Sequence, residues 1–553
     1  MARAPERPIL FDRTPLAVGP QETLLHALGR RGWPAVQRSI RYHRPRGPFC
    51  GVGYCTGCLV RVNGRPNVRA CRYEPSPGDV VTTENSWPSP RFDLLGALDY
   101  LFPRGIDTLH GFRRPAWATR AYHRIVRRLA GFGAAPDGPG APAAPPLRRT
   151  VDVAIVGAGP AGRAVAACLA NAGVRPLVID RQLHPPPVPG TDLLGRTTVT
   201  FLPPPGASGD ARFALLGFEE PARGVEVRAR SVVVASGGYD ASLFFGGNDR
   251  PGVVTADGAF ALLDANERLP FGRAVVVGGG DRVDTVLERF GDAVAAVVAP
   301  GGIEPSVVRR ASDQGIPLYP RSLVLRADGR SRVRSLTLRP RGGGPRFSLP
   351  CDAVVLAHRR LPTPQLFFQA GARMEWRAGS GAYHPVLSDA AETTVPGLFA
   401  VGAAAGMLPG QDAAVGERVV ARIQRGATAD PAPLPRVPAE GPAELEGYYR
   451  ELLLEPRSGR WVACPCEDVL ISEVEEAHQR GYRGIEVIKR YTGLGTGLCQ
   501  GRYCLPDALL VLSLLEERPP PEVGYITQRP PVVPTPLAAF AALTDPSAVA
   551  EGT

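Results

Sequence analysis

One stretch, VDVAIVGAGPAGRAVAACLANAGVRPLVID at residues 151–180, most strongly limits the folds open to this chain. The apolar run at 151–156 predicts a buried strand, a helix is expected to about residue 171, and a second strand ends at Asp180. Glycines between strand and helix allow a tight turn and a close approach of a pyrophosphate to the helix N-terminus, and the acid can accept ribose hydroxyls. We therefore predict a dinucleotide-binding (Rossmann-type) fold whose cofactor contacts Gly157, Ala158, Gly159, Pro160, Ala161, Gly162, Asp180 and Arg181.

Two later segments are expected at the same cofactor. Residues 225–238, VEVRARSVVVASGG, predict a β-hairpin followed by a serine-glycine turn, and residues 393–406 predict a strand ending in a glycine turn. Both resemble segments that return to the FAD site in flavoproteins with two dinucleotide-binding units. This resemblance places Ser236, Gly237 and Gly402 at the cofactor. FAD is therefore the expected cofactor. Many such proteins carry a flavin-binding acid where this chain has Ala403, and this departure keeps NAD or ATP open as alternatives.

A second glycine motif, RAVVVGGGDRVDTVLERF, occupies residues 273–290. Gly278 and Gly280 fit the dinucleotide pattern, but Val283 stands at the third glycine position, and the next strand ends at Pro300 without a ribose-binding acid. This unit either binds NAD through the two glycines or is kept for packing. The core has no C-x-x-C dithiol, which argues against disulfide-reductase chemistry.

Eight of the ten cysteines fall in two sets. In the first, Cys50, Cys55, Cys58 and Cys71 have the spacing C-x4-C-x2-C followed by a more distant cysteine, which is typical of plant-type [2Fe–2S] ligation. Strands at 59–62 and 65–70, joined by an Asn63-Gly64 turn, are expected to return Cys71 to the loop. A structural zinc site is the alternative.

The second set is Cys464, Cys466, Cys499 and Cys504. Helices are expected between the two pairs and after the last cysteine, so that two helix–turn junctions present the pairs to each other. We predict a second [2Fe–2S] cluster, with zinc a stronger rival here because paired cysteines also suit tetrahedral zinc.

Composition and proline-rich stretches divide the chain. We expect a domain at 1–115, a linker at 116–149, a nucleotide-binding core at 150–430 with its second unit at about 255–385, a domain at 446–515, and an extended tail at 516–553. The net charge of +11 comes from scattered arginines without a nucleic-acid-binding signature, so no nucleic-acid partner is expected. No apolar run long enough for a transmembrane helix and no apolar leader occur, and we expect a cytoplasmic protein.

The chain resembles the α subunits of heteromeric amine and amino-acid oxidases and dehydrogenases. The likeness lies in RSIRYHRPRGPFCGVGYCTGC, TTENSWPSPRFDLLGALDYLFP, ASGGYDASLFFGGNDRPGVVTADGA, CPCEDV, GTGLCQGRYC and RPPVVPTPLAAFA. The resemblance implies an α/β multidomain fold: a β-grasp ferredoxin-like domain, a flavoprotein core with two dinucleotide-binding units, and a small helical [2Fe–2S] domain related to bacterioferritin-associated ferredoxin. It also implies a partner β subunit of the D-amino-acid oxidase type, which would oxidise the amine, and FMN at the subunit boundary.

These patterns lead to one main hypothesis and two alternatives. The main hypothesis is an electron-transferring flavin and iron–sulfur subunit of an enzyme that oxidises a secondary amine or amino acid. The alternatives are a self-contained NAD(P)H-dependent ferredoxin-type reductase and a zinc-stabilised assembly scaffold with a degenerate nucleotide fold. The sequence singles out no catalytic acid or base in this chain.

Overall fold

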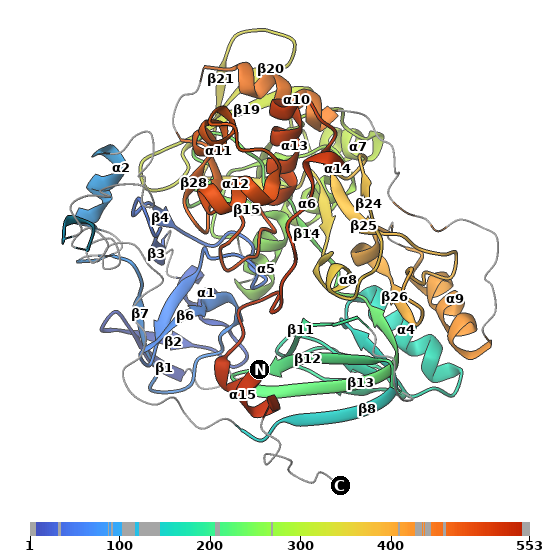
Figure 1. The fold of residues 1–553 in the computed structure, drawn as a ribbon. Coiled ribbons are helices and arrows are strands. Elements are labelled where there is room, and N and C mark those ends of the chain that lie inside the picture. The colour runs from blue at the N-terminus through green and yellow to red at the C-terminus, as the bar shows by residue number, and fades with distance from the viewer. Residues whose placement is uncertain are drawn as a thin grey trace. The chain divides into compact units, whose positions relative to one another are not determined.

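The chain divides into two compact units, each assembled from segments that are distant in sequence (Figure 1). Unit 1 combines Met1–Gly138, Asp240–Arg359 and Glu444–Tyr525, and unit 2 combines Pro139–Tyr239, Arg360–Ala443 and Ile526–Thr553. The structure is a computed structural model that describes residues 7–30, 35–86, 88–89, 92–101, 117–120, 144–204, 211–266, 269–407, 410–425, 434, 436, 444–456 and 460–544.

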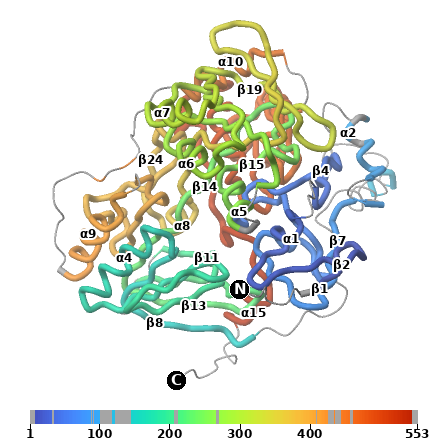
Figure 2. Tube along the Cα trace, turned by 180° about the vertical axis from the view of Figure 1, so that it is seen from behind, coloured from blue at the N-terminus to red at the C-terminus, as the bar shows by residue number. Residues whose placement is uncertain are grey.

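Unit 2 is built on a seven-stranded sheet with the strand order β10-β9-β8-β13-β12-β11, in which β26 also pairs with β13. Strands β10, β9, β8, β13 and β26 run parallel, whereas β12 and β11 are antiparallel to their neighbours. Helices α4 and α9 pack against each other beside this sheet (Figures 1 and 2). The bounds are β8 (Leu147–Val156), α4 (Pro160–Asn171), β9 (Leu177–Ile179), β10 (Asp192–Leu194), β11 (Thr197–Phe201), β12 (Phe213–Glu219), β13 (Arg223–Val234), β26 (Leu398–Ala400) and α9 (Asp412–Arg425).

The strand–turn–helix–strand expected at 151–180 is present, and its apolar residues form the centre of the core of unit 2. The hairpin expected within 225–238 is wrong. Residues 223–234 form one strand, β13, and its hairpin partner is β12. The alternation of Val and Arg at 225–230 is the period-two pattern of a single strand, and the turn lies earlier, around Pro221.

The middle of unit 1 is a second α/β fold, with a five-stranded parallel sheet in the order β15-β22-β16-β17-β18. The strand–turn–helix expected at 273–290 is confirmed as β16 followed by α6. An antiparallel sheet, β19-β20-β21, extends this part. The bounds are β15 (Val253–Thr255), α5 (Ala256–Asn266), β16 (Ala274–Val277), α6 (Asp281–Phe290), β17 (Val294–Val298), α7 (Pro305–Asp313), β18 (Leu318–Tyr319), β19 (Ser322–Asp328), β20 (Ser335–Pro340), β21 (Phe347–Pro350) and β22 (Ala353–Leu356).

The N-terminal part of unit 1 is a β-grasp-like sheet in the order β2-β1-β7-β5-β6, with α1 packed on it. The hairpin of β5 and β6 is confirmed: Asn63 and Gly64 have φ values of 49° and 81°, as a type I′ turn requires. The bounds are β1 (Arg7–Phe11), β2 (Thr14–Val18), α1 (Leu24–Arg30), β5 (Leu59–Val62), β6 (Arg65–Arg69) and β7 (Val80–Thr83).

The C-terminal part of unit 1 is mainly helical. A short hairpin of β27 and β28 precedes α11 and α12, and the long turn after α12 leads into α13, whose residues Leu505–Ser513 are all buried. The bounds are α10 (Glu444–Leu454), β27 (Val462–Cys464), β28 (Val469–Leu470), α11 (Ile471–Gln479), α12 (Ile485–Thr492), α13 (Leu505–Glu516) and α14 (Pro520–Val523).

The tail differs from the extended segment that its prolines led us to expect. Val532 N–H donates to the Thr200 carbonyl at 3.0 Å, and α15 (Leu537–Thr544) packs on β13 within unit 2 (Figure 2). The run LAAFAALT consists largely of strong helix formers, which explains the helix. Of the expected linker, residues 121–143 lie outside the described residues, and the domain bounds given above stay predictions. No helix among the described residues is long and apolar enough to cross a membrane.

Candidate functional site: two cysteine sets and a nucleotide crevice

The first cysteine set lies in unit 1, on the loop before β5 and directly after β6. Hydrogen bonds join the sulfurs into two pairs, Cys50 with Cys55 and Cys58 with Cys71, and all four side chains are buried. Backbone amides also point at the sulfurs: Cys55 N–H donates to Cys50 Sγ at 3.3 Å, and Gly57 N–H donates to Cys55 Sγ at 3.4 Å. Amides aimed at sulfur are the environment that thiolate ligands require.

Hydrogen bonding also controls the acidity of these thiols. Burial raises the pKa of Cys50, but hydrogen bonds from Cys55 and from the amides of Val52 and Tyr54 outweigh it and lower the pKa to about 5. The hydrogen bond with Cys71 likewise lowers the pKa of Cys58. Each pair therefore contains one thiol poised to ionise, and the thiolate is the form that binds metals.

The second cysteine set also lies in unit 1, and its sulfurs form a continuous series of hydrogen bonds: Cys504 with Cys464, Cys464 with Cys466, and Cys466 with Cys499. Cys464 ends β27, Cys466 lies in the following turn, and Cys504 is the N-cap of α13. The hydrogen bond with Cys464, together with burial, raises the pKa of Cys466 to about 12. Binding of a metal would therefore release protons from this set.

The grouping of the cysteine sulfurs helps to decide which metal group each set could hold. Among the residues that the structure describes, no three His, Cys, Asp or Glu side chains are grouped so as to hold a single metal ion. In a [2Fe–2S] cluster, four cysteines ligate two irons, two on each. Both sets bring four buried, hydrogen-bonded sulfurs together and so have the donors that such a cluster needs.

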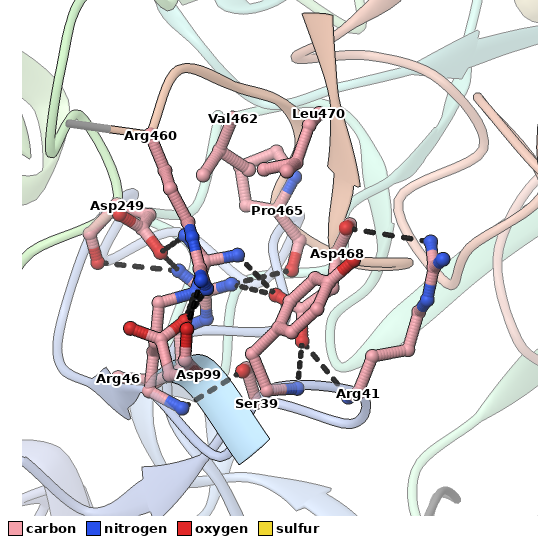
Figure 3. Close-up of polar contacts among 12 residues, drawn as sticks. Ser39, Arg41, Arg46, Asp99, Asp249, Arg460, Val462, Pro465, Asp468 and Leu470 are labelled. Atoms are coloured by element: carbon pink, nitrogen blue, oxygen red, sulfur yellow. Dashed lines mark hydrogen bonds and ion pairs between the residues drawn. The ribbon is translucent and has the colours of Figure 1, made fainter. Parts of the chain in front are cut away.

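A buried ion network holds the turn of the second set against the loop that precedes the first (Figure 3). The carboxylate of Asp468, two residues after Cys466, accepts hydrogen bonds from the backbone amides of Arg41 at 2.9 Å and Tyr42 at 3.2 Å. It also pairs with the guanidinium groups of Arg44 and Arg46. Burial raises the pKa of Asp468, but these arginines, Arg46 first, lower it to about 2.

Asp249, from the second nucleotide-type fold, completes this network. Its carboxylate lies 3.1 Å from the guanidinium of Arg44 and also pairs with Arg46. Arg44 and Arg46 thus bridge two buried acids that are far apart in sequence, and all three parts of unit 1 meet at this point.

The dinucleotide crevice of unit 2 lies at the carboxyl end of β8, where the predicted glycines stand. Gly157 has φ 117°, and a Cβ there would lie 2.2 Å from the carbonyl oxygen of Ala235. A Cβ on Gly162 would lie 1.9 Å from the carbonyl oxygen of Gly157. No atom comes within 4 Å of a Cβ built on Gly159, so the space that a pyrophosphate needs is open.

The other predicted residues gather at the same ends of parallel strands. Ser236 and Gly237 follow β13, and Gly402 follows β26 with φ 62°, where a Cβ would lie 2.6 Å from Ala161 Cβ. Thr363, which the sequence did not indicate, bonds Ser236 Oγ at 2.6 Å and donates to the Gly237 carbonyl at 3.1 Å. The crevice at the carboxyl ends of such strands is where nucleotides bind.

Asp180 is placed at the crevice but is already hydrogen-bonded. Its carboxylate accepts from Ala158 N–H at 2.5 Å and from Gln182 N–H at 2.6 Å, so it fixes the glycine turn. Arg181, next in sequence, is half-buried. The ribose-binding role of Asp180 and the cofactor role of Arg181 stay predictions.

The second glycine motif, in unit 1, has an acidic rim. A Cβ on Gly278 would lie 2.5 Å from the Ala357 carbonyl oxygen, and one on Gly280 would lie 3.1 Å from Glu304 Oε1. Asp281 and Asp284 occupy the first turn of α6, and burial, followed by the charges of these two aspartates, raises the pKa of Glu304. This negative charge opposes the helix dipole that would otherwise attract a diphosphate.

Comparison with known proteins finds family models that match three parts of the chain. Family models match at residues 8–86 (2Fe-2S iron-sulfur cluster binding domain), 150–208 (FAD binding domain) and 458–544 (sarcosine oxidase A3 domain). The solved structure of L-proline dehydrogenase from P. horikoshii superposes with a TM-score of 0.67, 20% identity and coverage of 98% of both chains, which shows a shared fold. Fold and matches together define a flavin- and iron–sulfur-dependent oxidoreductase component.

Individual proteins with similar sequences are subunits of three kinds of enzyme. The alpha subunit of sarcosine oxidase from Rhizobium meliloti is 26% identical over 97% of this chain, and an opine oxidase subunit of Agrobacterium tumefaciens is 25% identical over 71%. Hydrogen cyanide synthase subunit HcnB of Pseudomonas aeruginosa is 26% identical over 59%. The chain is thus similar to these sarcosine oxidase α, opine oxidase and HcnB subunits. It spans 57% of the length of the R. meliloti sarcosine oxidase protein and 92% of the A. tumefaciens opine oxidase protein.

Two glycine substitutions separate folding from cofactor binding in unit 2. Gly162→Ala is expected to lower the free energy of unfolding by about 1–3 kcal/mol, because its Cβ meets backbone. Gly159→Ala is expected to fold normally but to lose bound flavin, because its Cβ enters only the open space. Urea denaturation and flavin fluorescence after release measure the two effects. Equal flavin content in Gly159→Ala and wild type would contradict the location of the pyrophosphate.

Asp468→Asn tests the ion network that anchors the second cysteine set. Removing this fully buried charge leaves two guanidinium groups partly unpaired. We therefore expect the free energy of unfolding of unit 1 to fall by about 3–5 kcal/mol. Glu476→Gln, which breaks an exposed pair with Arg480, is the matched control and should cost less than about 0.5 kcal/mol. Chemical denaturation of both variants measures the difference, and equal stability would show that the network contributes little.

Proposed function

We propose that this chain is the electron-transferring subunit of a heteromeric oxidoreductase that oxidises a secondary amine or amino acid of the sarcosine, proline, hydroxyproline or opine kind. The proposal rests above all on two buried sets of four hydrogen-bonded cysteines in one unit, together with a separate nucleotide crevice in the other. The relatives, among them sarcosine oxidase, opine oxidase and L-proline dehydrogenase, suggest the substrate class.

The residues suggest a division of cofactors. The first set would hold one [2Fe–2S] cluster, the second set another, and the crevice at Gly157–Gly162 would hold FAD. Bound there, the flavin accepts two electrons and the clusters pass electrons one at a time. NAD or ATP remains the competing occupant of the crevice, because Ala403 stands where a flavin-binding acid was expected.

The proposal assigns substrate oxidation to a partner. The sequence singles out no acid or base for C–N bond oxidation in this chain, and the proposal therefore places that step on a separate β subunit of the D-amino-acid oxidase type, with FMN at the boundary. Hydrogen cyanide synthase subunits HcnA and HcnB, named as separate subunits, both match this chain, HcnA at 39% identity over 15% of it. A cytoplasmic location is part of the proposal.

The alternatives have less support. A self-contained NAD(P)H-dependent reductase needs a pyridine-nucleotide site at Gly278 and Gly280, where Glu304, Asp281 and Asp284 place negative charge. We propose instead that this second unit serves as a scaffold for the cysteine sets: Gly51, in the first cysteine loop, lies in close contact with Gly258 and Ala261 of α5. A zinc-stabilised scaffold would not require the flavin crevice.

Metal and flavin analysis of the anaerobically purified chain tests the cofactor content. We expect about four irons and four acid-labile sulfides with about one FAD. Cys58→Ala and Cys504→Ala should each lose about half of the iron, whereas Cys351→Ala, a buried thiol outside both sets, should retain it all. Zinc in place of iron would contradict the proposal and support the scaffold alternative.

Anaerobic stopped-flow spectroscopy separates the amine-oxidising complex from the reductase alternative. We expect NADH to leave the flavin of the isolated chain oxidised, because acidic side chains line the second nucleotide motif. We expect a secondary amine to reduce the chain only when the flavoprotein partner is present. Rapid bleaching by NADH alone, or full amine dehydrogenase activity without a second polypeptide, would overturn the division of labour.

A further inference from the structure

The two cysteine sets touch each other inside unit 1, although more than half of the chain separates them in sequence. Thr56 lies between Cys55 and Cys58, and its hydroxyl donates to Cys466 Sγ at 3.4 Å. Thr56 is 8% exposed and Cys466 is 4% exposed, so the hydrogen bond lies in the interior, away from bulk water. A side chain of the first set thus contacts a sulfur of the second.

A second contact runs in the opposite direction. Tyr503 directly precedes Cys504, and its hydroxyl hydrogen-bonds to Cys50 of the first set. The tyrosine ring is buried and packs edge-on against Phe49, with ring centroids 5.1 Å apart. A side chain of the second set therefore contacts a sulfur of the first.

The backbone of each hydroxyl-bearing residue is held in place by a further hydrogen bond. The carbonyl oxygen of Thr56 accepts a hydrogen bond from Gln37 Nε2, and the carbonyl oxygen of Tyr503 accepts one from Ser242 Oγ. Two arginine contacts add to this junction: Arg502 stacks over the Tyr54 ring with its guanidinium carbon 4.6 Å from the centroid, and Arg69 reaches the Leu498 carbonyl at 3.5 Å. These contacts fix both loops, so the Thr56 hydroxyl is held close to Cys466 Sγ and the Tyr503 hydroxyl close to Cys50 Sγ.

From this reciprocal arrangement we infer that Thr56 and Tyr503 tune the reduction potential of the cysteine set opposite to their own. This inference rests on the proposed function, in which both sets hold [2Fe–2S] clusters. A hydrogen bond to a ligand sulfur stabilises the additional negative charge of the reduced state and so raises the potential. Thr56 would raise the potential of the second set, and Tyr503 that of the first. Both are positioning residues, since neither supplies a ligand.

Redox titration of the full-length chain, monitored by electron paramagnetic resonance, tests the inference. Thr56→Val removes the hydroxyl at nearly constant size. We expect it to weaken electron binding by the second set about tenfold, which is a fall of about 59 mV in its reduction potential, and to leave the potential of the first set unchanged. Tyr503→Phe is expected to lower the reduction potential of the first set by a similar amount and to leave the potential of the second set unchanged. Cys58→Ala and Cys504→Ala, each lacking one set, assign the two signals.

Matched controls come from two hydroxyl-bearing residues of the same part of unit 1 whose described contacts are with groups other than sulfur. Thr496 donates to the Gly493 carbonyl at 2.7 Å, and Tyr482 packs against Tyr491 near the surface. Thr496→Val and Tyr482→Phe should leave both potentials at the wild-type values. Thr56→Ser keeps a hydrogen-bond donor and should return the reduction potential of the second set to the wild-type value. If Thr56→Val loses iron, Thr56→Ala takes its place in the experiment.

The outcomes separate this inference from the function on which it rests. Unchanged potentials in Thr56→Val and Tyr503→Phe, or equal shifts of both sets in one variant, would overturn the cross-tuning while leaving the two-cluster proposal standing. A wild-type chain without iron and sulfide in either set would overturn both.

Discussion

The pairing of Asp468 with Arg44 and Arg46 is the interaction on which the arrangement of unit 1 depends. A fully buried carboxylate next to two guanidinium groups tolerates little displacement, because each charge would otherwise be left without a partner in a low-dielectric interior. Asp468 follows Cys466 by two residues, and Arg46 precedes Cys50 by four. Fixing the ions therefore fixes the two cysteine turns against each other, and the contacts of Thr56 and Tyr503 follow from that alignment.

Local patterns in the sequence were enough to predict the parts of the site that depend on neighbouring residues. The turn at Asn63-Gly64 needs two positive φ values, and the turn at 157–162 needs glycine because backbone approaches within 2.2 Å of a Cβ at Gly157. Both constraints act within a few residues, and both predictions are confirmed. The position of Asp180 at the end of β9 was predictable for the same reason.

What the sequence did not reveal depends on pairing between distant segments. The strand at 223–234 was split into a hairpin because its partner β12 lies beyond a turn that the pattern did not mark. The role of Thr363 beside Ser236, and the acids that face Arg44, come from segments that only the tertiary fold brings together. The helix α15 was hidden by surrounding prolines, although its own residues favour helix.

The division of the chain into interleaved units has a consequence for biosynthesis. Chains emerge from the ribosome N-terminus first, and domains fold as units when their segments are complete. Unit 1 draws its last segment from Glu444–Tyr525, so Arg44 and Arg46 are made long before Asp468, the second of the two acids with which they pair. The N-terminal arginine loop can therefore complete its ion network only after the segment Glu444–Tyr525 has been synthesised. If the second set holds the proposed cluster, on this ordering that cluster can form only after the first set has been synthesised.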